Sequence, residues 1–173
     1  LTARLVEVFD RGGPPQRLVY IGTTGVYGDC GGAWVNEDWP PRPVASRARR
    51  RWDAEQRLRA WTDVSGAELV ILRVAGIYGP GRLPLERLRK RLPMVGEDEA
   101  PWTNRIHVDD LVEVLIAAMR KADDAAIYNV SDGNPGNMRD YFDRVADLAG
   151  LERPPLVKLA EADGRLSAGL LSY

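Results

Sequence analysis

An apolar run followed by three evenly spaced glycines is the feature that most constrains this chain. The segment Arg17-Leu-Val-Tyr-Ile21 is rich in strand-forming residues, and Gly22, Gly25 and Gly28 follow it at intervals of three. A strand that runs through a glycine turn into a helix would hold the pyrophosphate of a dinucleotide. Two glycines and three prolines between residues 31 and 43 oppose a helix here. We therefore expect these glycines to shape the end of a strand.

Strand and helix patterns alternate along the chain, which predicts an α/β fold with a parallel sheet. Buried strands are expected at 17–22 and 68–73, and a third strand at 126–130. Helices are expected at 1–9, 47–64, 84–92, 109–121 and 138–149. The helix at 47–64 places Ala54, Leu58 and Trp61 on one face and stops at Gly66. Asn137 is expected to cap the last helix.

Composition and charge narrow the class of protein. The 173 residues are 45% apolar and 28% charged, and the net charge of −1 does not favour a nucleic-acid or membrane partner. No apolar run reaches the length of about 18 residues that a membrane-spanning helix needs, and residues 1–10 lack the pattern of a signal peptide. A single cysteine, Cys30, excludes an intramolecular disulfide framework and gives no metal-site spacing. We expect a cytoplasmic protein without a bound metal.

Several motifs occur in an order that is typical of one family. They are TTGVYGD at 23–29, Glu37, Pro43, Glu55, ILRVAGIYGPGR at 71–82, RIHVDD at 105–110 and IYNVSDG at 127–133. Together they resemble the extended short-chain dehydrogenase/reductases, the NAD(P)-dependent nucleotide-sugar epimerases and dehydratases, and they look closest to the YeeZ-like branch. The resemblance runs from about residue 17 to about residue 150. It implies NAD or NADP as cofactor and a small-molecule substrate of the nucleotide-sugar type.

The resemblance also implies a domain plan, the second half of a Rossmann-like parallel sheet with part of a small substrate-binding domain. Residues 1–81 would form the C-terminal half of the NAD(P)-binding domain, 82–125 a substrate-side insertion, 126–150 a strand and helix that return to the sheet, and 151–173 a weakly defined tail. The first βαβ unit of the family has no counterpart here. We therefore expect a fragment of a longer protein, with one uncovered sheet edge.

Thr23 is the candidate catalytic residue that the resemblance implies. In the family, a Ser or Thr three positions before the Val of the VYG motif binds the reacting oxygen of the substrate. A hydroxyl both donates and accepts hydrogen bonds, which suits proton relay at a carbonyl. The alternative is a strand-end threonine that satisfies the local backbone. Thr24 follows it and is expected to contact substrate.

The catalytic Tyr-x-x-x-Lys pair of the family is missing. Its two positions fall on Arg47 and Arg51, and no tyrosine lies between Tyr27 and Tyr78. Arginine cannot exchange a proton near neutral pH, because its pKa exceeds about 12. Arg51 is left as a residue that holds the cofactor ribose or phosphate, with a solvated basic helix face as the alternative. Two functions stay open, an active oxidoreductase or epimerase/dehydratase and an inactive dinucleotide-binding sensor of the same fold.

The remaining candidate residues come from the later motifs. The resemblance implies that residues 71–81 close over the nicotinamide and the substrate. Cofactor contacts are expected from the residues that end this strand, namely Arg73, Val74 and Ala75. Substrate contacts are expected from Tyr78, Arg82 and His107. For Arg82 the alternative is a solvated turn residue, and for His107, the only histidine, a structural role.

A third function rests on the helix at 47–64. In the family this helix often joins the helix bundle of a dimer, so the resemblance implies a homodimer formed through it. A structural or interaction protein is the corresponding alternative to an enzyme or a sensor.

Overall fold

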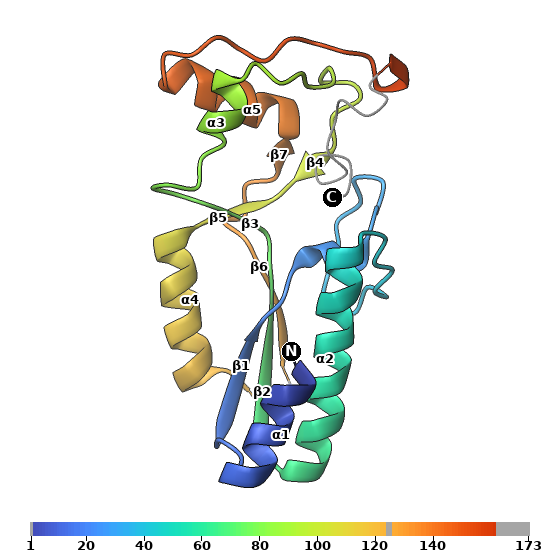
Figure 1. Ribbon diagram of the computed structural model, residues 1–173, viewed down its shortest axis with the longest axis vertical. Coiled ribbons are helices and arrows are strands. Elements are labelled where there is room, and N and C mark those ends of the chain that lie inside the picture. Colours follow the sequence, from blue (N-terminus) through green and yellow to red (C-terminus); the bar gives the residue numbers. More distant parts are fainter. Residues whose placement is uncertain (1, 124–125, 162–173) are drawn as a thin grey trace. The chain divides into compact units, whose positions relative to one another are not determined.

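The computed structural model describes residues 2–123 and 126–161, which fall into two compact units (Figure 1). The first unit comprises Leu1–Ala75 and Asp109–Val130, and the second comprises Gly76–Val108 and Ser131–Tyr173. The boundaries between these units differ from the boundaries of the four predicted functional segments. The segments 1–81, 82–125, 126–150 and 151–173 therefore stay a prediction about the intact protein.

The first unit is built on a three-stranded parallel sheet in the order β1-β2-β6. The strands are β1 (Arg17–Ile21), β2 (Glu68–Val74) and β6 (Ile127–Val130), each within a residue or two of its predicted position. Tyr20 lies opposite Ile71, and Ile71 lies opposite Ile127. Since the strands run in the same direction, they end at one edge of the sheet, as the predicted α/β fold requires.

Three helices cover this sheet. In Figure 1, α1 (Thr2–Gly12) and α2 (Ser46–Ser65) lie on one side of the strands and α4 (Val108–Lys121) on the other. The predicted inner face of α2 is confirmed, because Ala54, Leu58 and Trp61 are buried and Gly66 ends the helix in the left-handed conformation. Apolar side chains of α1, α2 and the three strands form one core cluster, made of Val6, Leu18, Tyr20, Leu58, Leu69, Ile71 and Ile127.

The expected burial of the first strand is wrong. Residues 17–20 are half-buried and Ile21 is 41% exposed, because β1 is an outer strand of the described sheet. Polar contacts hold the start of this strand. The Arg17 guanidinium donates to the Glu68 carboxylate at 2.6 Å and to the Ala118 carbonyl, near the end of α4, at 3.0 Å.

The second unit combines two short helices with two small strand pairs. The helices are α3 (Leu85–Arg89) and α5 (Met138–Leu148). Strands β3 (Gly76–Tyr78) and β5 (Arg105–His107) pair in parallel, whereas β4 (Trp102–Thr103) and β7 (Gly136–Asn137) pair antiparallel. The core of this unit contains the buried residues Leu88, Met94, Val95, Ala100, Met138, Phe142, Val145 and Ala146.

The helix ends in this unit follow local rules, with one correction. The Asn137 side chain accepts a hydrogen bond from the Arg139 N–H at 2.7 Å, which confirms the predicted cap. The predicted helix at 84–92 is too long, because Arg91 has a positive φ of 50° and Pro93 disfavours helix at the residue before it.

The predicted weakly defined tail is described only to residue 161. Its first part pairs with the second unit, since Met94 and Leu156 form a parallel bridge and the Val157 N–H donates to the Met94 carbonyl at 3.0 Å. The short helix η2 (Leu159–Glu161) follows. Residues 162–173 lie outside the described part of the chain.

Candidate functional site

Thr23 and Thr24 lie directly after β1, at the edge where the parallel strands end. Thr23 has an extended backbone and caps the 3-10 helix η1 (Thr24–Tyr27), and its Oγ1 accepts a hydrogen bond from the Gly25 N–H at 3.2 Å. Both threonines are half-buried. The capping bond is the local role considered as the alternative for Thr23. It uses one lone pair and leaves the hydroxyl proton without an acceptor among the described residues, so the same group can still donate to a ligand.

The glycines of this segment shape the turn, as expected. Gly28 has a φ of 77°, and a Cβ at this position would overlap the Arg42 carbonyl, so only glycine fits here. Its N–H donates to the Gly25 carbonyl and ends η1. The next helix, α2, begins at Ser46, so the described chain has no helix that opens directly after the turn. The segment therefore lacks the geometry of a phosphate-binding glycine turn.

Arg73, in the buried part of β2, forms the centre of a charged cluster inside the first unit. Its Nε and Nη2 donate to Glu55 Oε2 of α2 at 3.2 and 2.9 Å, and its Nη1 donates to the Tyr27 hydroxyl at 2.8 Å. The rings of Tyr27 and Trp52 lie 4.9 and 5.6 Å from the guanidinium. Arg73 is 1% exposed and Glu55 is fully buried.

The pKa of Arg73 is raised above its ordinary value. Burial alone lowers it, but the hydrogen bonds to Glu55 and Tyr27 and the charge of Glu55 together outweigh burial. The guanidinium therefore stays charged inside the unit. The predicted cofactor contact of Arg73 stays a prediction. In the described chain, its guanidinium forms hydrogen bonds with Glu55 and Tyr27.

A second set of bonds joins the cluster to the long loop between η1 and α2. The Tyr27 hydroxyl donates to Asn129 Oδ1 at 2.7 Å. Asn129, on β6, donates from its backbone N–H to Glu37 Oε1 at 2.7 Å and from Nδ2 to the Val35 carbonyl at 3.2 Å. The loop is therefore tied to the ends of β2 and β6.

The other predicted cofactor residues lie on two elements of the same unit. Val74 ends β2 and Ala75 follows it. Both are buried, and the Ala75 N–H donates to the Val130 carbonyl at 3.0 Å. Arg47 and Arg51 lie on α2 and are exposed, and neither forms an ion pair within the described chain. No described hydrogen bond links Arg51 to Thr23. The roles of Val74, Ala75 and Arg51 toward a cofactor stay predictions.

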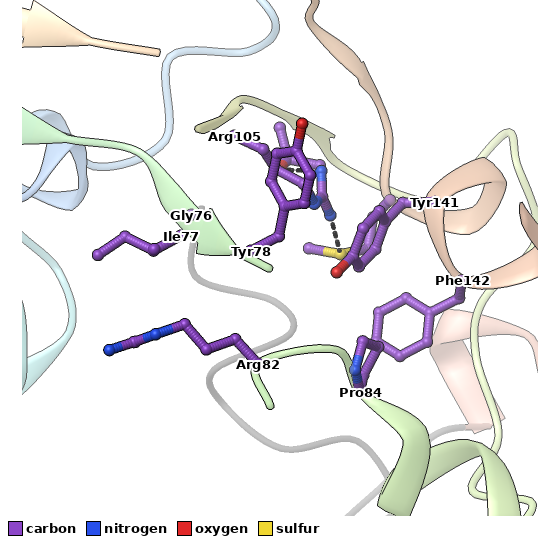
Figure 2. Close-up of a pocket in the computed structure, with 10 residues that line it drawn as sticks. Gly76, Ile77, Tyr78, Arg82, Pro84, Arg105, Tyr141 and Phe142 are labelled. Carbon is purple, nitrogen blue, oxygen red and sulfur yellow. Dashed lines mark hydrogen bonds between the residues drawn. The ribbon is translucent and has the colours of Figure 1, made fainter. Parts of the chain in front are cut away.

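The second unit contains a cavity of about 190 Å³, shown in Figure 2. Two of the predicted substrate residues, Tyr78 and Arg82, line it together with Arg105. Arg105 lies 3.5 Å from the centre of the Tyr141 ring and donates to Thr103 Oγ1 at 3.0 Å and to Met138 Sδ at 3.4 Å. None of the described lining residues is acidic, so this cavity presents positive charge beside aromatic rings.

His107 ends β5 in the same unit and packs edge-on against Tyr78, with the ring centres 5.2 Å apart. The position of His107 also explains why residue 79 is a glycine. Gly79 has a φ of 140°, and a Cβ there would lie 2.8 Å from Val108 Cγ1 and 3.2 Å from His107 Nε2. The structure thus brings Tyr78 and His107 together, while the contact of His107 with substrate stays a prediction.

Sequence reasoning missed Arg105, Tyr141 and the partners of Arg73. A charged residue within the apolar strand ELVILRV was a signal, because a buried arginine needs a buried partner. Glu55, which shares the inner side of α2 with Leu58, was a candidate for that partner. For Tyr141, on a helix far along the chain, the sequence offers no local signal of a cavity.

A metal site, a membrane-spanning helix and a reactive cysteine find no support within residues 2–123 and 126–161. No group of three His, Cys, Asp or Glu side chains there could hold a metal ion. None of the helices is long and apolar enough to cross a membrane. Burial, with a smaller contribution from Asp29, raises the pKa of the Cys30 thiol, which disfavours the reactive thiolate at neutral pH.

Comparison with known proteins places this geometry in context. The model of the NAD dependent epimerase/dehydratase family matches residues 1–131. Protein YeeZ of Escherichia coli K12 is 29% identical over 138 residues, which cover 80% of this chain and 48% of YeeZ. The chain thus spans about half the length of this curated relative.

Two solved structures extend the likeness to the fold. A conserved protein of unknown function from Silicibacter pomeroyi DSS is 39% identical with a TM-score of 0.81, covering 96% of this chain and 58% of that one. The UDP-glucose 4-epimerase of Thermus thermophilus, solved with NAD, is 28% identical with a TM-score of 0.75, covering 90% of this chain and 55% of that one. Both support a Rossmann-like α/β architecture.

Proposed function

Because this chain belongs to the NAD dependent epimerase/dehydratase family, we propose that it is part of an NAD- or NADP-dependent oxidoreductase or epimerase/dehydratase. The proposed substrate is a sugar carried by a nucleotide. The observation that carries the proposal is the family match across residues 1–131, which includes the strand end with Thr23 and the cluster around Arg73. The likeness to an NAD-bound UDP-glucose 4-epimerase supports the same cofactor and substrate class.

Three residues of the first unit have the chemistry to contact a dinucleotide. Arg51 is an exposed cation that can pair with a ribose or phosphate oxygen, and Val74 and Ala75 offer an apolar strand end. Bound NAD would supply hydride transfer at a substrate carbon. Thr23 would donate its hydroxyl proton in a hydrogen bond to the reacting oxygen, while the Gly25 N–H holds the hydroxyl in place at 3.2 Å. Thr24 would contact the same substrate.

The cavity of the second unit supports an anionic, aromatic substrate. Arg82 and Arg105 can pair with phosphate oxygens, and Arg105 is already oriented by its contacts with Thr103 and Tyr141. The rings of Tyr78 and Tyr141 offer faces for a planar base. A nucleoside diphosphate sugar combines these two chemistries. His107, packed on Tyr78, would contact the same ligand.

An inactive dinucleotide-binding sensor is the second candidate, and one observation favours it. The exposed positions where the resemblance expects the catalytic tyrosine and lysine carry Arg47 and Arg51, and α2 contains neither tyrosine nor lysine. Neither arginine can act as general acid or base near neutral pH. In the sensor, the cofactor would bind without turnover.

Two measurements on the intact protein separate these candidates. Fluorescence titration with NADH and NADPH tests cofactor binding, and saturable binding is expected for both candidates. Turnover with UDP-glucose and UDP-glucuronic acid under saturating NAD then separates the enzyme from the sensor. Product formation supports the enzyme. Binding of cofactor and of UDP-glucose without any product supports the sensor.

A further inference from the structure

The Tyr27 hydroxyl joins four elements of the first unit. It accepts a hydrogen bond from Arg73 Nη1 of β2 at 2.8 Å and donates to Asn129 Oδ1 of β6 at 2.7 Å. Arg73 is held in turn by Glu55 of α2. Tyr27 itself is the last residue of η1, the turn that Thr23 caps. One phenol therefore connects the turn that presents the threonines to a helix and two strands.

The same network reaches the loop that follows the turn. Asn129 binds Glu37 Oε1 with its N–H and the Val35 carbonyl with its side chain. Arg73 Nη1 adds a longer bond to the Glu37 carbonyl at 3.4 Å. The Arg42 N–H donates to the Val26 carbonyl at 2.9 Å, which ties the end of the loop back to η1. The position of the loop thus depends on the same groups as the position of the turn.

None of the three central side chains can reach a ligand directly. Arg73 is 1% exposed, Glu55 is 0% exposed and Tyr27 is 4% exposed. Their donors and acceptors bond to one another, to Asn129 Oδ1 or to the Glu37 carbonyl, except for Glu55 Oε1, a buried oxygen without a hydrogen-bond partner in the described chain. That oxygen lies 3.0 Å from where a Cβ of residue 22 would stand, so Gly22 lets the strand end approach α2 closely. Such groups influence a ligand only through the backbone that they hold.

We propose that Arg73, Tyr27 and Asn129 are positioning residues, which fix the turn that carries Thr23 and Thr24 and hold the loop at 29–45 against the strand ends. Arg73 acts in this way without contacting the cofactor. The part of this inference that concerns turnover rests on the proposed function, whereas the part that concerns the backbone does not. The two parts can therefore be tested separately.

Tyr27→Phe is the sharpest variant, because it removes only the hydroxyl and keeps the ring beside the guanidinium. The matched control is Tyr128→Phe on the neighbouring strand β6, where the tyrosine is 37% exposed and its hydroxyl forms no hydrogen bond within the described chain. Hydrogen exchange, followed by mass spectrometry, is measured on the intact protein for peptides covering 22–28, 29–45 and the strand 68–74.

In Tyr27→Phe, amides at 22–45 should exchange about tenfold faster than in the unaltered protein, with little change in β2. The control should exchange as the unaltered protein does. Equal rates at 22–45, or an equal acceleration in β2, would overturn the proposal, because the first shows no positioning and the second only lost global stability. This readout decides the backbone part even if the protein binds no dinucleotide.

The kinetic part uses NAD affinity and the turnover of UDP-glucose. Positioning predicts that Tyr27→Phe lowers kcat about tenfold and leaves the Kd for NAD unchanged. Arg73→Lys should behave in the same way, because an ammonium cannot bridge Glu55 and Tyr27 as the planar guanidinium does. A weaker Kd for NAD in Arg73→Lys but not in Tyr27→Phe would overturn the assignment and restore a cofactor contact. If the unaltered protein neither binds NAD nor turns over substrate, the proposed function has failed on its own, and the exchange data still stand.

Discussion

At the scale of single residues, we predict that the Thr23 hydroxyl has two roles, one as a cap and one toward the substrate. Its oxygen caps η1 through the Gly25 N–H, and under the proposed function its proton would be donated to a substrate oxygen. Thr23→Val should lower kcat about a hundredfold, the range for a lost proton-relay group, with the affinity for NAD unchanged. Thr23→Ser retains both hydrogen-bonding roles and should keep most of the activity. Steady-state kinetics on both variants checks this, and equal loss in both would remove Thr23 from the chemistry.

The buried pair between Arg73 and Glu55 predicts a large effect on stability. Glu55→Gln removes the charge that balances the guanidinium in a site where both side chains are at most 2% exposed. The free energy of unfolding should fall by about 3–5 kcal/mol, because an uncompensated buried charge remains. Urea denaturation measures this change.

The same helix offers a matched control for that measurement. Asp53 and Arg57 form an ion pair at 2.8 Å in which both side chains are more than half exposed. Asp53→Asn should lower the free energy of unfolding much less than Glu55→Gln does, since solvent screens an exposed pair. Similar losses in the two variants would contradict the view that burial makes the Glu55 pair important.

At the scale of elements, glycine, proline and apolar spacing were sufficient to predict most of the helices and strands. The strand at 68–73, the inner face of α2 and the cap at Asn137 follow from local chemistry alone. The end of α3 was missed. The predicted helix continued to the residue before Pro93, whereas α3 ends at Arg89 and Arg91 has a positive φ that breaks the helical conformation. The exposure of β1 depends on which strand lies beside it, and local sequence does not report that.

The exposed face of α2 bears on the proposed homodimer. Arg47, Arg50 and Arg51 are exposed, and α2 has no acidic residue in its first turn. Two copies that met along this helix would bring like charges together. If the dimer forms through α2, raising the salt concentration from about 0.05 to 0.5 M should strengthen it, because screening reduces the repulsion. Sedimentation at both salt concentrations tests this, and a dimer that weakens with salt would exclude this face.

At the scale of the whole molecule, the candidate site could be predicted only in part. Thr23, Tyr78 and Arg82 were candidates because each lies in one of the ordered motifs that carry the family resemblance, and the structure places Tyr78 and Arg82 on one cavity. The cavity of the second unit joins residues at 76–84, 103–105 and 138–142, which only folding brings together. Arg105 and Tyr141 could therefore not be paired in advance. The cluster around Arg73 likewise draws on five separate segments.

The most direct test is dinucleotide binding by the intact protein, because the enzyme and the sensor both require it. The chain spans about half of YeeZ, so the titration uses the complete polypeptide. We predict that NADH or NADPH fluorescence will change along a saturable curve, that unlabelled NAD or NADP will compete, and that Tyr27→Phe will leave the affinity unaltered. Absence of saturable binding for both dinucleotides would contradict the account.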